Sequence, residues 1–193
     1  ESPFEPKTPY NASKAAGDMA VETFHLTFGL PVTISNCSNN YGPYQFPEKV
    51  IPRFCTLALQ GEKMTLYKTS QNKREWLHVD DHCRAIDLIL KQGKVGEMYN
   101  VGSGLEVDVE GIADGILGVL GLDDSYKTYV PDRPSHDRRY LLDSNKIRNE
   151  LGWSPEVDYG EGFAATVNWY KENEAWWQPL LSRAAEVDEG KWG

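Results

Sequence analysis

The chain has 193 residues, of which 40% are apolar and 25% are charged. These proportions are typical of a globular protein and exclude a disordered chain or a collagen-like fibre. Its 29 acidic residues outnumber its 20 Lys and Arg residues, giving a net charge of −9. This acidity argues against nucleic-acid binding, because such proteins need a basic face that neutralises phosphates.

The sequence carries no signal for a membrane or for secretion. No run of about 18 apolar residues is present, so we expect no spanning helix. Residues 1–6 lack the basic and apolar regions of a signal peptide. The cysteines, Cys37, Cys55 and Cys83, are odd in number and form no C-x-x-C pair, which favours reduced thiols. We therefore expect a cytoplasmic protein.

Helical and extended patterns alternate in the first third of the chain. Small and apolar side chains recur every three or four residues over 9–28, which predicts a helix that ends at Gly29. A β-branched run predicts a strand over 32–37, followed by a polar loop over 38–49. The pattern then returns to a helical one over 50–59.

The same alternation continues to the end of the chain. Strands are predicted over 64–67, 76–79, 98–101 and 127–130, and helices over 109–120, 144–151 and 160–173. Either Asp80 or Asp81 is expected to cap a further helix that follows the strand at 76–79. The stretch containing Trp176 and Trp177 is expected to dock as a tail outside the core. Alternating strands and helices predict an α/β fold with parallel strands.

Tyr10 and Lys14 are the clearest chemical signal. A spacing of four residues places the phenol and the ammonium on one face of the predicted helix. A phenol is a poor base near neutral pH, and a neighbouring cation stabilises its phenolate form. The pair could thus take a proton from an alcohol that loses a hydride. The spacing alone also occurs often by chance on solvated helix faces.

Three further blocks accompany this pair. They are NCSNNYGPYQFPEKVIP at residues 36–52, REWLHVDDH at 74–82 and DRPSHDRRY at 132–140. With Tyr10-x-x-x-Lys14, these blocks resemble the dTDP-glucose 4,6-dehydratase family of the extended short-chain dehydrogenase/reductase superfamily. The resemblance implies the later part of a Rossmann-like parallel sheet and a smaller α/β nucleotide-sugar-binding lobe. Residues 1–45 would belong to the NAD-binding domain and 46–193 mainly to the substrate lobe, interleaved with Rossmann elements around 75–102.

The resemblance also implies a reaction and a set of site residues. NAD would serve as the cofactor for converting dTDP-glucose to the 4-keto-6-deoxy sugar. Tyr10 would act as the base at the 4-hydroxyl, and Lys14 would support it and hold the nicotinamide ribose. Asn40 would contact the cofactor near the nicotinamide. The implied substrate-binding residues are Asn39, Lys49, Val50, Thr65, Leu66, Tyr67, Arg74, Asn100, Asp132, Arg133 and His136.

Two parts of the family pattern are missing. No predicted strand is followed by a G-x-x-G-x-x-G turn: Gly115, Gly118 and Gly121 have this spacing but fall in and just after the helix predicted over 109–120. Gly102-Ser103-Gly104 follows a strand but has no third glycine to complete the turn. The family's Thr-Asp-Glu segment is also absent. We therefore expect the second half of a longer enzyme, inactive alone, whose partner is the N-terminal half or a second copy. Alternatives are a related nucleotide-sugar epimerase or dehydratase, or a non-catalytic nucleotide-sugar-binding module. His78 and His82 lack a third ligand, so no metal site is expected.

Overall fold

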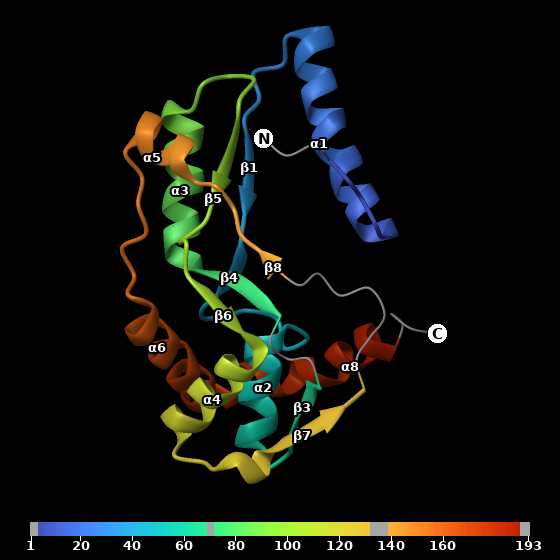
Figure 1. Cartoon of the computed structure of the whole chain (residues 1–193), viewed down its shortest axis with the longest axis vertical. Helices are drawn as coiled ribbons and strands as arrows, with labels where there is room; N and C mark the ends of the chain where they lie inside the picture. Colours follow the sequence, from blue (N-terminus) through green and yellow to red (C-terminus); the bar gives the residue numbers. More distant parts are fainter. Residues whose placement is uncertain (1–3, 69–71, 132–138, 190–193) are drawn as a thin grey trace.

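The structure, a computed structural model, describes residues 4–68, 72–131 and 139–189. Its first helix, α1 (Pro9–Phe28), lies to one side of the molecule (Figure 1). The Thr8 hydroxyl accepts the backbone N–H of Asn11 at the start of α1, and Gly29 ends it in the left-handed conformation. None of the residues of α1 is buried.

One half of the molecule is built around a pair of parallel strands. Strand β1 (Ile34–Cys37) pairs with β5 (Met98–Val101). Helices α3 (Val79–Gln92) and α5 (Asn145–Leu151) pack beside them (Figure 1). The core between these elements consists of Leu77, Ala85, Ile89, Tyr99, Val101, Ile147 and Trp153.

A second sheet forms around β4 (Lys73–His78). The end of β4 pairs in parallel with β2 (Asn39–Tyr41). Its beginning pairs with antiparallel β6 (Glu106–Asp108) and with parallel β8 (Arg139–Tyr140). This strand therefore gathers segments from distant parts of the chain.

The other half of the molecule contains a third strand pair and most of the apolar core. Strand β3 (Met64–Tyr67) runs parallel to β7 (Lys127–Val130). Helices α2 (Val50–Leu59), α4 (Val109–Leu120) and α6 (Tyr159–Glu172) pack against one another here. The chain closes with α7 (Glu174–Trp177) and α8 (Leu181–Glu189), and short 3-10 turns lie at Asp124–Tyr126 and Gln178–Leu180.

Gly115 explains how two of these helices come close together. A Cβ at this position would lie 2.8 Å from Cε1 of Phe163 on α6. Glycine thus costs α4 some helical propensity but lets the aromatic ring pack against its backbone.

The α/β class with parallel strands is confirmed, and most predicted elements form close to their expected positions. Three local predictions are wrong. The loop predicted over 38–49 contains strand β2, because β4 supplies its pairing partner. His78 caps α3 instead of an aspartate, with Nδ1 accepting the backbone N–H of Asp80. Trp177 is 1% exposed and belongs to the core.

Candidate active site

The predicted catalytic pair lies on the first turns of α1. Tyr10 is 71% exposed and Lys14 is exposed, so the described residues do not enclose either side chain. Burial raises the pKa of the Cys37 thiol, while a hydrogen bond with Asn40 and the charge of Lys14 oppose this shift. Lys14 therefore lies within electrostatic range of the end of β1.

Asn40 is held by hydrogen bonds on both sides of its amide. Its Nδ2 donates to the carbonyl of Ser38 at 2.9 Å, and its Oδ1 lies 2.7 Å from Nδ1 of His82. Because that oxygen only accepts, His82 must donate from Nδ1. Its Nε2 then faces Ser35 Oγ at 3.4 Å. Burial lowers the pKa of His82, which favours the neutral ring.

The sequence did not assign His82 a role in the site. The histidine lies within the REWLHVDDH block, which is a signal that it belongs near the strand ends. Its partner Asn40 lies 42 residues earlier, however, and only the packing of α3 beside β2 brings them together. Asn39 is half-buried and lies opposite Trp76 in the ladder between β2 and β4.

The predicted residues Tyr67 and Arg74 lie in two separate ladders, Tyr67 at the end of β3 and Arg74 near the start of β4. In the β3–β7 ladder Tyr67 lies opposite Val130, and the Lys68 N–H donates to the Val130 carbonyl at 3.1 Å. Arg74 lies opposite Tyr140 in the β4–β8 ladder. The chain thus leaves β7 beside Tyr67 and re-enters β8 beside Arg74. Asp132, Arg133 and His136 lie outside the described residues.

The remaining predicted substrate residues differ in exposure. Thr65 is exposed and Tyr67 half-buried, whereas Leu66 is fully buried in the core and offers only its backbone. Lys49 is the residue before α2, which Val50 begins, and its ammonium lies 3.4 Å from the Glu48 carboxylate. Asn100 is half-buried and lies opposite Asn36 in the β1–β5 ladder.

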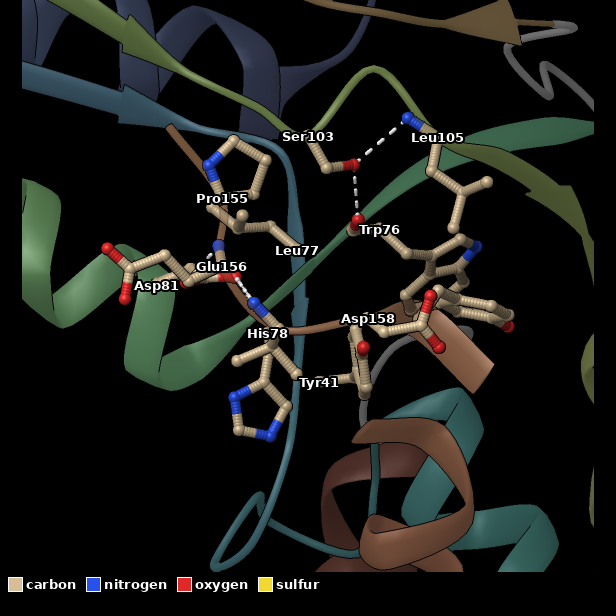
Figure 2. A pocket seen from close by; sticks show the side chains of 12 residues that line it. Tyr41, Trp76, Leu77, His78, Asp81, Ser103, Leu105, Pro155, Glu156 and Asp158 are labelled. Atoms are coloured by element: carbon tan, nitrogen blue, oxygen red, sulfur yellow. Dashed lines mark hydrogen bonds between the residues drawn. The ribbon is translucent and has the colours of Figure 1, made fainter. Parts of the chain in front are cut away.

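A hollow of about 350 Å³ lies beside β4 (Figure 2). It is lined from β4 by Trp76, Leu77 and His78. It is also lined by the segment from Pro155 to Tyr159, the first residue of α6. Burial raises the pKa of Tyr159 to about 12, so its phenol stays protonated. None of the predicted site residues lines this hollow.

Within residues 4–68, 72–131 and 139–189, no group of three or more His, Cys, Asp or Glu side chains is arranged to hold a metal ion. Over the same ranges, no helix combines the length and apolar character needed to cross a bilayer.

Comparison with known proteins places this arrangement in a family. The family model for GDP-mannose 4,6 dehydratase matches residues 1–166, and the chain belongs to this family. The family lies within the extended short-chain dehydrogenase/reductases, and the chain is homologous to dTDP-glucose 4,6-dehydratases.

Two relatives show the level of similarity. The dTDP-glucose 4,6-dehydratase of Streptomyces niveus is 50% identical over 94% of this chain and 54% of its own length. The enzyme of the same name from Escherichia coli is 44% identical over 94% of this chain and 52% of its own length. The chain therefore spans about half the length of these relatives.

Solved structures agree with this assignment. DesIV, a dTDP-glucose 4,6-dehydratase from Streptomyces venezuelae solved with NAD and TYD bound, superposes with a TM-score of 0.91 at 50% identity. The match covers 93% of this chain and 56% of DesIV. UDP-glucose 4-epimerase of Thermotoga maritima, solved with UDP-glucose, gives a TM-score of 0.82 at 29% identity, covering 88% of this chain and 55% of the epimerase.

Proposed function

We propose that this chain forms part of an NAD-dependent dTDP-glucose 4,6-dehydratase, which converts dTDP-glucose to dTDP-4-keto-6-deoxyglucose and water. The observation that carries this proposal is the 50% identity to the Streptomyces niveus enzyme across 94% of the chain. The 29% identity to a UDP-glucose 4-epimerase is much lower, which favours the dehydratase over the epimerase.

The described residues suit one end of the cofactor. Lys14 has an exposed ammonium, and the half-buried Asn40 amide is held in place by its hydrogen bonds to Ser38 and His82. The buried hydroxyl of Ser38 has no hydrogen-bond partner in the described part of the chain. These groups suit a nicotinamide ribose. The glycines with G-x-x-G-x-x-G spacing, Gly115, Gly118 and Gly121, lie in and at the end of helix α4, so they form no strand-to-helix turn that could seat the pyrophosphate.

Within that arrangement, Tyr10 takes the proton from the sugar 4-hydroxyl. Lys14, one helical turn away, stabilises the phenolate and binds the ribose hydroxyls. NAD, when bound, supplies the hydride acceptor that the oxidation at C4 requires. Asn40 contacts the cofactor with an orientation set by Ser38 and His82, and Asn39 contacts the sugar.

The nucleotide is held at the ends of β3, β4 and β5. A nucleoside diphosphate carries about two negative charges, which an acidic chain must balance locally. Arg74 supplies a cation at this edge, and Asn100 adds hydrogen bonds. Thr65, Leu66 and Tyr67 flank the base, with Tyr67 offering an aromatic face. Lys49 and Val50 contact the sugar, and residues 132–136 complete the nucleotide contacts.

The exposed apolar side chains of α1 point to a further polypeptide partner. Met19, Phe24, Leu26 and Phe28 are all more than half exposed. Leaving such a surface in water is unfavourable, and patches of this kind mark protein contacts. The rest of a longer protein or a second copy covers α1 in the active enzyme, so the chain alone gives no turnover.

Calorimetric titration with dTDP, UDP and GDP tests this function. We expect dTDP to bind most tightly and Arg74→Ala to weaken it about tenfold, since a hydrogen bond to a charged group contributes about 1.5–3 kcal/mol. Preference for UDP would favour the epimerase. Binding without turnover, even after the N-terminal half of a relative is supplied by co-expression, would favour a non-catalytic module. Turnover of dTDP-glucose by the chain alone would refute its expected inactivity.

A further inference from the structure

Glu75 on β4 is a fully buried carboxylate between two other segments. Its Oε1 accepts the backbone N–H of Gly104 at 2.6 Å, and its Oε2 accepts that of Leu142 at 2.9 Å. Both oxygens therefore face donors, an arrangement that suits a carboxylate better than an amide. Charge-assisted hydrogen bonds of this kind offset the cost of burial and hold all three segments in place.

The Gly102-Ser103-Gly104 turn is shaped around this side chain. A Cβ on residue 102 would lie 2.3 Å from Oε1 of Glu75, and Gly104 has a φ of +85°. Glycine is therefore required at 102 by contact and favoured at 104 by conformation. Glycine-rich turns often direct N–H groups at an external anion, but here the Gly104 N–H binds the protein's own carboxylate.

Ser103 adds a second attachment between the same turn and β4. Its hydroxyl donates to the Trp76 carbonyl at 2.7 Å and accepts the N–H of Leu105 at 3.0 Å (Figure 2). The turn is thus bonded to two successive residues of β4. Because β4 and β5 belong to different hydrogen-bonded sheets, these bonds help to fix one sheet against the other.

The residues joined in this way adjoin the proposed diphosphate site. Arg74 immediately precedes Glu75 on β4, and Asn100 lies on β5 two residues before Gly102. Leu142, the third segment held by Glu75, follows β8, whose Tyr140 lies opposite Arg74. A shift of the turn would therefore change the separation of Arg74 and Asn100.

We propose that Glu75 is a positioning residue, whose carboxylate in the Gly102–Gly104 turn sets the spacing of Arg74 and Asn100 for a nucleoside diphosphate. This inference rests on the proposed function and assigns Glu75 a part in it. Glu75 does not touch the ligand and acts through Arg74 and Asn100.

Calorimetric titration of the chain with dTDP tests this role. Glu75→Gln turns an NH₂ toward one of the two backbone donors, and we expect dTDP to bind about tenfold more weakly. The control Glu97→Gln removes a carboxylate that pairs with Lys146 near the surface, and should leave binding unchanged. Glu75 acts largely through Arg74. In a chain that already carries Arg74→Ala, adding Glu75→Gln should therefore weaken dTDP binding by a further factor of less than about three.

A milder change protects the test against misfolding. Ser103→Ala keeps Glu75 but removes the hydroxyl that joins the turn to β4, and should weaken dTDP binding by about threefold. If the wild-type chain binds no dTDP, the proposed function fails and this inference fails with it. If the wild type binds dTDP and the folded Glu75→Gln variant binds it equally well, this inference alone is overturned. If Glu75→Gln does not fold, wild-type dTDP binding by Ser103→Ala overturns it instead. Fully additive losses with Arg74→Ala would also overturn it.

Discussion

The Nδ1–H of His82 donates to Oδ1 of Asn40 over 2.7 Å, joining helix α3 to strand β2. The carbonyl of Ser38 accepts from the other end of the same amide at 2.9 Å. The amide therefore cannot rotate without losing both bonds. A residue proposed to contact the cofactor is fixed by the fold before any ligand binds, which reduces the ordering cost of binding.

The His82 pair predicts that stability falls in mild acid. Burial lowers the pKa of the folded histidine below its ordinary value of about 6.5, so the unfolded chain binds the proton more readily. This contribution is complete above about pH 6.5 and declines as the pH falls toward the folded pKa. Urea unfolding from about pH 7.5 to about pH 5.5 should show a steeper loss for the wild type than for His82→Gln. Parallel losses would contradict the shift.

Asp81 and Asp80 should differ sharply when each is changed to Asn. Asp81 is 1% exposed, and its carboxylate accepts the N–H groups of Glu156 at 3.0 Å and Val157 at 3.1 Å and pairs with Arg84. Asp81→Asn should therefore cost about 3 kcal/mol of unfolding free energy. Asp80 has a side chain 76% exposed, and Asp80→Asn should change stability by less than about 0.5 kcal/mol. Equal losses in urea titrations would count against this account.

Trp177 should contribute more to stability than its neighbour Trp176. The Trp177 indole is 1% exposed and donates to the Tyr170 carbonyl at 2.7 Å. We expect Trp177→Ala to cost about 3–5 kcal/mol. Trp176 is half-buried against Tyr44 and Trp169, and its replacement by Ala should cost less than about 2 kcal/mol. Chemical unfolding measures both values. A smaller loss of unfolding free energy for Trp177→Ala than for Trp176→Ala would indicate that this segment is a docked tail outside the core.

The apolar side of α1 should drive self-association of the isolated chain. The ring centroids of Phe24 and Phe28 lie 5.6 Å apart in a tilted arrangement, and the two residues are 54% and 74% exposed. Sedimentation velocity should show concentration-dependent association that decreases when both residues are changed to Ser. Leu90→Ser on α3 is the control, because Leu90 is 78% exposed on a different helix. Equal effects of the two changes, or no association at all, would contradict a specific contact through α1.

Local patterns predicted those elements whose signals lie within a few residues. The periodicity over 9–28 and the following Gly29 predicted both the body and the end of α1. Strand β2 was missed because it is short and polar, and its partner β4 lies more than 30 residues later. Two adjacent aspartates look alike in sequence, and only the distant residues 156 and 157 make Asp81 the buried one.

The candidate site remains a prediction, although the structure shows where its described residues lie. Sequence blocks predicted that Arg74 and Tyr67 share one site. In the structure they lie in separate ladders, Tyr67 opposite Val130 of β7 and Arg74 opposite Tyr140 of β8. The support from His82 and Glu75 was not predicted, because both act through contacts 29 to 67 residues away along the chain. The roles of Tyr10 and Lys14 remain predictions, since both side chains are exposed.

Mapping dTDP onto the chain by NMR tests the central proposal most directly. Backbone amide shifts on titration should be largest at Thr65, Tyr67, Arg74 and Asn100, with UDP and GDP giving smaller changes. No shifts, or shifts confined to the hollow lined by Trp76 and Tyr159, would contradict a nucleotide-sugar site at the ends of β3, β4 and β5.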